Sequence, residues 1–170
     1  MKTAVIGYSG SGKSTLADRI AAKQGVPVLH FDCVHWLPGW VERSPAETFA
    51  IVGRFMDEND SWVIDGNYSK HHYERRMEEA DRIIFLNFGR WTCLLRAMKR
   101  RIRYHNRTRS SMTVGCPEKL DWKFIKWIMH DSRTKRAKER YQSVVDRYCE
   151  KIVVLRNQRE LEAYIRHESL

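Results

Sequence analysis

A glycine-rich turn near the start of the chain places the strongest constraint on the fold. The stretch GYSGSGKST, residues 7–15, follows the apolar run TAVIG, residues 3–7, and precedes a segment with helical spacing over 13–24. Its first eight residues match the pattern GxxxxGK[ST] in the order strand, turn, helix, and this context makes the pattern specific. Glycines allow the backbone to turn so that its N–H groups point at an anion. The sequence therefore predicts a loop that binds the phosphates of a nucleoside triphosphate.

The polar side chains of this loop have separate expected roles. Lys13 is expected to reach the β and γ phosphates and to act in catalysis, and the Ser14 hydroxyl is expected to ligate Mg²⁺. The other residues expected to contact the nucleotide are Gly7, Ser9, Gly10, Ser11, Gly12 and Thr15. ATP and Mg²⁺ are therefore the expected cofactors. An ordinary glycine-rich turn is the alternative interpretation, and the complete motif argues against it.

Short apolar runs alternate with longer helical patterns along the rest of the chain. Strands are expected at 3–7, 27–31, 62–65, 82–87 and 151–155, and helices at 13–24, 45–58, 70–79, 90–105, 119–149 and 158–166. This alternation is typical of βαβ units, and nearly continuous apolar strands are typical of a parallel sheet covered on both faces. The predicted fold class is α/β: a P-loop NTPase with a five-stranded parallel sheet flanked by helices.

Length and cysteine usage limit the remaining possibilities. A chain of 170 residues suits a single domain, 1–170, with one core. The four cysteines are scattered without the spacing of a zinc site or a disulfide framework, so we expect a reduced, cytoplasmic protein. No apolar run approaches the roughly 20 residues of a membrane span, and no membrane partner is expected.

Acidic residues follow two of the predicted strands. Ligands of parallel sheets bind at the carboxyl ends of the strands. Asp32 follows the strand at 27–31, and we expect it to hold an acceptor hydroxyl or to take its proton. Asp65 ends the strand at 62–65, where an acid holds Mg²⁺ or its water shell in P-loop enzymes. The alternative for both carboxylates is that they only stabilise turns.

Residues next to these two acids are the expected acceptor site. His35 and Trp36 follow Asp32, and Gly66, Asn67 and Tyr68 follow Asp65. A glycine at position 66 would let a substrate approach the backbone closely. We therefore expect these residues, with Asp32, to contact the acceptor.

The positive charge of the chain is concentrated in its second half. The net charge is +10, and residues 90–109 contain eight Lys or Arg and no Asp or Glu. The least regular stretch, 106–118, overlaps the end of this basic run, so the region of about 100–120 is the expected lid of the site. Arg107 and Arg109 are expected to act on the transferred phosphoryl when this lid closes, and Arg136 to add a second row of donors from a helix. The alternative is a basic face in contact with solvent.

Several longer stretches carry a resemblance to a known family. They are GYSGSGKST, FDCVHW, WVIDGNY, ADRIIFLNFGRWTCLLRAMKRRIRY and GCPEKLDWKFIKWI. In this order they resemble the bacterial P-loop proteins labelled DNA topology modulation proteins, which are adenylate-kinase-like in fold. The resemblance implies a nucleotide-binding, kinase-like protein, and the family name suggests an influence on DNA supercoiling. The chain departs from the family pattern at Ser110 and Ser111, where a Pro and an Asp are expected.

Two function classes follow from these features. The first is a phosphotransferase that moves the γ-phosphoryl of ATP to a small-molecule or nucleotide acceptor. The second is a nucleic-acid-binding regulator that uses ATP as a switch and holds phosphates with its basic segments. Because the chain has no helix-turn-helix, zinc-finger or RNA-binding signature, the sequence favours the phosphotransferase. It leaves the acceptor and the oligomeric state open.

Overall fold

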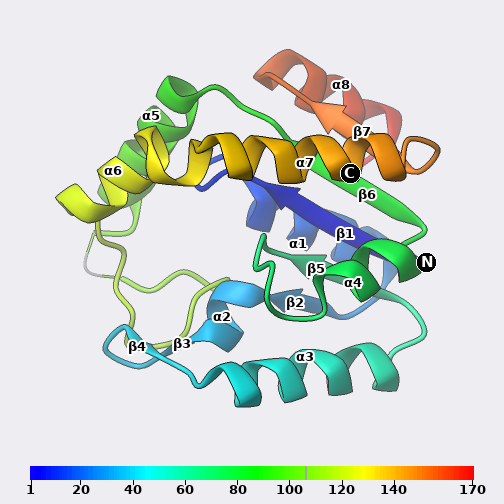
Figure 1. Ribbon diagram of the computed structural model, residues 1–170. Coiled ribbons are helices and arrows are strands. Elements are labelled where there is room, and N and C mark those ends of the chain that lie inside the picture. Colours follow the sequence, from blue (N-terminus) through cyan, green and yellow to red (C-terminus); the bar gives the residue numbers. More distant parts are fainter. Residues whose placement is uncertain (106) are drawn as a thin grey trace.

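A five-stranded parallel sheet forms the centre of the computed structural model, which describes residues 1–105 and 107–170 (Figure 1). Its strands are β1 (Lys2–Gly7), β2 (Val28–His30), β5 (Trp62–Asp65), β6 (Arg82–Leu86) and β7 (Ile152–Leu155). They run side by side in the order β2-β5-β1-β6-β7, and all of them are parallel. This architecture confirms the predicted α/β fold class.

Helices cover both faces of this sheet. The longer ones are α1 (Lys13–Gln24), α3 (Pro45–Glu58), α4 (Tyr73–Glu79), α5 (Arg90–Arg103), α7 (Lys135–Arg147) and α8 (Gln158–His167). Local sequence explains several of their ends. Ser44 caps α3 by accepting a hydrogen bond from the Glu47 amide at 3.2 Å, and Gly25 ends α1 with a φ of 63°.

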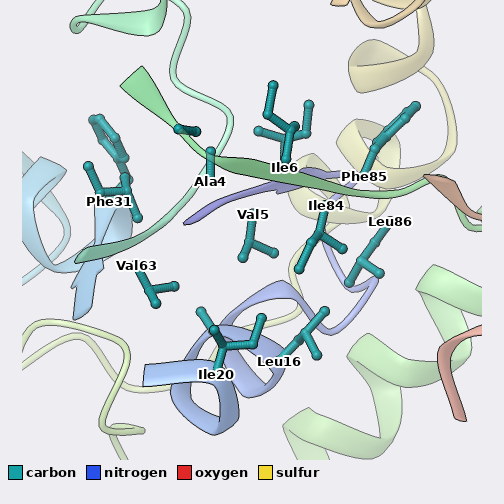
Figure 2. Packing of buried hydrophobic residues seen from close by; sticks show 14 of the residues in the cluster. Ala4, Val5, Ile6, Leu16, Ile20, Phe31, Val63, Ile84, Phe85 and Leu86 are labelled. Atoms are coloured by element: carbon teal, nitrogen blue, oxygen red, sulfur yellow. The ribbon is translucent and has the colours of Figure 1, made fainter. Parts of the chain in front are cut away.

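The strands have apolar side chains on both faces, as the sequence predicts. Val5, Ile84 and Leu86 point toward Leu16 and Ile20 of α1 (Figure 2). Ile6 and Phe85 point to the opposite face of the sheet. On that face, Phe85 stacks on Tyr141 of α7 with ring centroids 4.4 Å apart. The helices α1 and α7 therefore cover opposite faces and hold the carboxyl ends of the strands in place.

The expected helix at 119–149 is wrong. The chain instead forms α6 (Trp122–Met129), the 3₁₀ helix η1 (Asp131–Arg133) and then α7. Asp121 caps α6 by accepting from the Phe124 amide at 2.8 Å, and Thr134 caps α7 by accepting from the Ala137 amide at 3.2 Å. Each cap begins a new helix, so the chain changes direction between them.

The strand expected at 27–31 is also shorter than predicted. It ends at His30, and the next residues form the short helix α2 (Phe31–His35), so Asp32 lies in the first turn of a helix. An unexpected hairpin follows, made of β3 (Trp36–Leu37) and β4 (Val41–Glu42). The helix expected from residue 70 begins at Tyr73, and the one expected to reach residue 105 ends at Arg103.

The expected lid region of about 100–120 contains the end of α5 and a connection to α6. Asn106 lies outside the described residues. From residue 107 to residue 121 the chain forms turns and loops without a helix or strand. Among the helices of the described residues, none is long and apolar enough to cross a lipid bilayer.

Candidate functional site

The glycine-rich loop is packed closely against two other elements. Gly7, Gly10 and Gly12 have φ angles of 144°, 81° and 99°, which residues with a side chain rarely adopt. A Cβ atom at Gly7 would lie 2.5 Å from the carbonyl oxygen of Leu86 in β6, and one at Gly10 would collide with the carbonyl oxygen of Cys93 in α5. The loop needs these glycines both for its turn and for its close approach to β6 and α5.

Side chains from α5, α6 and η1 hold the loop from outside. The Arg96 guanidinium donates to the Ser11 carbonyl, and the Trp127 indole N–H donates to Ser9 Oγ at 3.1 Å. The Arg133 guanidinium lies 3.7 Å from the centre of the Tyr8 ring. Sequence reasoning missed Arg96 and Trp127, because nothing in the local pattern shows that these helices return to the loop. It did not identify the contact between Arg133 and Tyr8 either.

The predicted nucleotide residues lie together at the start of α1. Lys13 Nζ donates to the Tyr8 carbonyl oxygen at 3.1 Å, so the ammonium group folds over the loop. Ser11 is buried, and its hydroxyl has no hydrogen-bond partner among the described residues. The Thr15 side chain is exposed, so its backbone N–H at the open start of α1 is the group left for a phosphate. The loop thus combines the Lys13 ammonium group with backbone N–H donors at the start of α1.

Asp65 lies beside this loop and is part of a chain of buried polar groups. Its Oδ2 atom is 3.1 Å from His30 Nδ1, and His30 Nε2 is 2.9 Å from Asp18 Oδ1. Burial raises the pKa of Asp65, but the hydrogen bond from His30, the positive charge of Lys13 and the Ser14 hydroxyl outweigh it and lower the pKa overall. Asp65 is therefore ionised at neutral pH. His30 was missed by sequence reasoning; a polar residue within the apolar run PVLHF was the available signal.

The same contacts act on His30 in the opposite direction. Burial lowers the pKa of His30, whereas its hydrogen bond to Asp65 and the charges of Asp65 and Asp18 raise it, and the net shift is upward. The two carboxylates therefore favour the protonated imidazolium. With a donor on each ring nitrogen, the imidazolium fixes the orientation of Asp65.

Asp32 lies in the first turn of α2, directly after β2, the strand next to β5, and is held by two donors. The Tyr68 hydroxyl donates to Asp32 Oδ1 at 3.0 Å, and Arg109 Nη2 donates to Asp32 Oδ2 at 3.0 Å. Burial and the Asp32 charge raise the pKa of Tyr68 well above its ordinary value, so Tyr68 remains a donor. The Asp32 carboxylate is still 37% exposed, which leaves it accessible to a further ligand.

Aromatic side chains surround this carboxylate. The His35 ring lies 4.8 Å from the Trp36 ring and 4.8 Å from the Tyr68 ring, measured between centroids. Burial lowers the pKa of His35, so its imidazole is neutral at pH 7. The structure thus brings together Asp32, His35, Trp36 and Tyr68, as the sequence predicts for the acceptor site.

Gly66 and Asn67 have other partners than the predicted acceptor. A Cβ atom at Gly66 would lie 2.5 Å from Phe31 Cβ, so the space beside Gly66 is filled by a side chain of the protein and not open to a substrate. The Cβ side of Gly66 is therefore closed to a substrate, and the predicted contact of its backbone with the acceptor stays a prediction. The Asn67 side chain donates to the Tyr141 hydroxyl of α7 at 2.5 Å.

A buried arginine supports the loop that carries these residues. Arg76 is fully buried, and its guanidinium donates to the carbonyl oxygens of Gly66 at 3.1 Å and Tyr68 at 2.7 Å. It also lies 4.3 Å from the centre of the Phe31 ring. Burial lowers the pKa of Arg76 to about 9, which still leaves the side chain charged at neutral pH. Nothing local in YERRMEE distinguishes this arginine from the adjacent, partly exposed Arg75.

The arginines expected to form a closing lid occupy different environments. Arg109 pairs with Asp32 and lies 4.0 Å from Glu118, which Arg100 contacts at 2.7 Å. Arg109 therefore contacts the carboxylate that is predicted to hold the acceptor. The side chains of Arg107 and Arg136 are exposed, and neither forms an ion pair within the part of the chain that the structure describes. Their catalytic roles stay predictions.

Comparison with known proteins supports the fold. A deoxyadenosine kinase from M. mycoides with bound dATP matches with a TM-score of 0.58, 14% identity and complete coverage of both chains. The same kinase with dCMP and dCDP matches with a TM-score of 0.53, 14% identity and 99% coverage of both chains. A sugar kinase from Janibacter sp. matches with a TM-score of 0.51 and 16% identity, covering 96% of this chain and 91% of that one.

These structural neighbours establish that the chain has the fold of P-loop kinases. No protein-family model and no curated protein matches the chain significantly. The resemblance of the sequence motifs to the DNA topology modulation family stays a prediction.

Proposed function

We propose that this chain is an ATP-dependent phosphotransferase that phosphorylates a hydroxyl group of a small-molecule or nucleotide acceptor. One observation carries the proposal. The P-loop lies beside Asp65, which is buried and ionised at the end of β5, and the partly exposed Asp32 follows the adjacent strand β2 at the same edge of the sheet. A protein that only binds ATP as a switch needs Asp65 for the metal, but it needs no carboxylate at Asp32 to accept a proton from a second substrate.

The residues of the site have distinct roles in the proposed reaction. Lys13 and the loop amides bind the β and γ phosphates of ATP. Asp32 orients the acceptor hydroxyl and takes its proton as the oxygen bonds to the γ phosphorus. The bond between that phosphorus and the β–γ bridging oxygen breaks, and ADP leaves. Tyr68 and Arg109 keep the Asp32 carboxylate in position through its two oxygens.

The site fits a magnesium ion held jointly by protein and nucleotide. Asp65 Oδ1 is buried and has no hydrogen-bond partner among the described residues, and Ser14 lies beside this carboxylate. No cluster of three or more His, Cys, Asp or Glu side chains in that part of the chain could hold a metal on its own. Mg²⁺ is typically bound by one or two protein oxygens together with phosphates and water, and it would neutralise charge on the phosphates.

The metal assignment predicts the behaviour of an Asp65→Asn variant. The substitution keeps the size of the side chain but removes its charge, so the Mg²⁺ concentration for half-maximal ATP turnover should rise by about tenfold or more. Asp60→Asn is the matched control, because Asp60 is an exposed residue that precedes β5 and lies outside the chain of contacts around Asp65. Equal Mg²⁺ dependence of the two variants would contradict the metal role of Asp65.

An acceptor screen tests the proposed function directly. The full chain is incubated with Mg²⁺, ATP labelled in its γ-phosphoryl group and a panel of nucleosides, nucleotides and sugars, and labelled products are detected by mass spectrometry. An Asp32→Asn variant should still bind ATP but should lose transfer by about 100-fold or more. Labelled product that forms equally fast with Asp32→Asn would show that another group activates the acceptor.

The basic segments give little support to the alternative of a nucleic-acid-binding regulator. Among the eight cations of residues 90–109, Arg96 contacts the P-loop, Arg100 pairs with Glu118 and Arg109 pairs with Asp32. These three side chains are engaged within the protein, so fewer cations of this segment remain for a phosphate backbone than its sequence suggests.

A further inference from the structure

The helix α5 carries a row of apolar side chains that faces away from the protein. Its members are Trp91 (66% exposed), Leu95 (57%), Met98 (44%) and Ile102 (78%). The spacing of four, three and four residues places them along one side of the helix. Cys93 and Ala97, which are 0% and 2% exposed, lie on the opposite side and pack into the protein. We call this row the α5 stripe. A contiguous exposed apolar surface of this kind marks an interaction site.

Positive charges border the α5 stripe along both sides. The helical spacing places Lys99 and Arg103 along one side, and Arg90 and Arg101 along the other. No acidic residue occurs between positions 90 and 109. None of these four cations forms an ion pair with an acidic side chain of the described residues, in contrast to Arg100, which pairs with Glu118. The surface that α5 presents is therefore apolar along its centre and cationic along its borders.

The neighbouring helix α6 carries a further exposed tryptophan. Figure 1 shows α5 and α6 next to each other, and Arg100 of α5 lies 6.0 Å from the centre of the Phe124 ring of α6. Trp122 in the first turn of α6 is 77% exposed, and the adjacent Lys123 is exposed as well. The same combination of an exposed tryptophan and a lysine thus occurs on α6, the helix that contacts Arg100 on the opposite side of α5 from the stripe.

We propose that the α5 stripe binds an anionic lipid surface, with α5 lying parallel to the membrane plane. An interfacial helix has an apolar face with Trp and Leu and borders of Lys and Arg, which contact lipid headgroups. A second copy of the chain is disfavoured because it would bring two sets of cations together. A partner helix usually docks into a groove, whereas the stripe lies on the outward side of a single helix.

Vesicle binding by the full chain tests this proposal. Co-sedimentation is compared for vesicles of phosphatidylcholine alone and vesicles that also contain phosphatidylglycerol. Leu95→Gln combined with Ile102→Gln removes half of the stripe, and Lys99→Gln combined with Arg103→Gln removes one cationic border.

Val41→Gln with Ile51→Gln is the apolar control, since both residues are exposed on β4 and α3, far from α5 (Figure 1). Lys135→Gln with Lys138→Gln on α7 is the charge control.

The expected result is binding to anionic vesicles that is at least about tenfold tighter than to neutral ones and that weakens with salt. Both α5 variants should lose about tenfold in affinity, and both controls should bind like the parent chain. The proposal is overturned if anionic vesicles do not bind, or if the α5 variants bind as well as the controls. It is also overturned if light scattering shows a dimer that Leu95→Gln with Ile102→Gln converts to monomer, because the stripe would then join two copies.

Discussion

Gly66 occupies a position where the structure leaves no room for a side chain. Its φ of 140° is unfavourable for other residues, and an added Cβ would lie 2.5 Å from Phe31 Cβ. We expect Gly66→Ala to lower the free energy of unfolding by about 3 kcal/mol, since overpacking adds to backbone strain. Urea denaturation measures this change. Gly25→Ala is the control: its φ is 63°, no atom lies within 4 Å, and a loss of about 1 kcal/mol is expected. Equal losses in the two variants would contradict the packing argument.

Cys33 is next to the acceptor carboxylate and should be unreactive at ordinary pH. Burial, followed by the negative charge of Asp32, raises the pKa of the Cys33 thiol to about 11. At pH 8 only about one molecule in a thousand carries the thiolate, and this fraction increases as the pH rises toward 11. Iodoacetamide at pH 8 should therefore modify the exposed Cys149 and leave Cys33 intact in the folded protein. Mass spectrometry of peptides checks this, and modification of both residues at the same rate would show that Cys33 is not protected.

The segment 107–118 is attached to the α2–β3 region by several hydrogen bonds. Thr113 Oγ1 donates to the Cys33 carbonyl at 3.0 Å, the Gly39 amide donates to the Gly115 carbonyl at 3.0 Å, and Cys116 Sγ donates to the Leu37 carbonyl at 3.2 Å. The sequence predicts a lid that is mobile without nucleotide. These contacts instead indicate a segment that rests on the acceptor side of the site before ATP binds.

Hydrogen exchange distinguishes these two descriptions of the segment. The Gly39 amide should be protected in the absence of ATP, and Thr113→Val should increase its exchange rate by about fivefold, the equivalent of one hydrogen bond. Val114→Thr is the control, because Val114 is 84% exposed. If the Gly39 amide exchanges fast in the parent chain and becomes protected when ATP and an acceptor are added, the segment is a lid that is mobile without nucleotide.

At the level of the whole molecule, nucleotide binding should appear as added thermal stability. ATP with Mg²⁺ at about 100 times the dissociation constant contributes about 2.7 kcal/mol, which corresponds to a rise in Tm of about 5–10 °C for a chain of this length. Lys13→Ala should fold normally, because Lys13 makes only one hydrogen bond to the loop backbone. It should lose most of the rise in Tm, because Lys13 is the residue proposed to bind the β and γ phosphates. Lys135→Ala is the control, since that side chain is 92% exposed.

The same measurement separates the two function classes. In this version of the thermal-stability assay, duplex DNA replaces ATP. Because the net charge of +10 attracts any polyanion weakly, the assay is run at physiological salt. We expect no rise in Tm with DNA at physiological salt. A DNA-dependent rise that persists in Lys13→Ala would favour the nucleic-acid-binding regulator over the phosphotransferase.

Local patterns in the sequence were sufficient for the loop and the sheet. The eight-residue motif ending at Ser14 specifies a strand, a turn and a helix by short-range sterics, and apolar runs specify strands that are buried on both faces. Because parallel strands end at one edge, Asp32 and Asp65 could be placed near the phosphates without knowing how the helices pack. The fold class and the core of the candidate site therefore follow from residues that are close together in the chain.

The tertiary structure decided which distant side chains meet. Arg109 contacts Asp32 across 77 positions and Asn67 contacts Tyr141 across 74, and helical spacing or turn chemistry carries no information about such pairs. Arg76 is buried among arginines that look alike in sequence, because the carbonyl groups of Gly66 and Tyr68 need a donor that only the folded chain supplies. The break between α6 and α7 also depends on packing, since its caps were too weak a local signal to outweigh a long helical pattern. Short-range sterics determine the elements of this protein, and the satisfaction of buried charges and polar groups across the sheet determines its site.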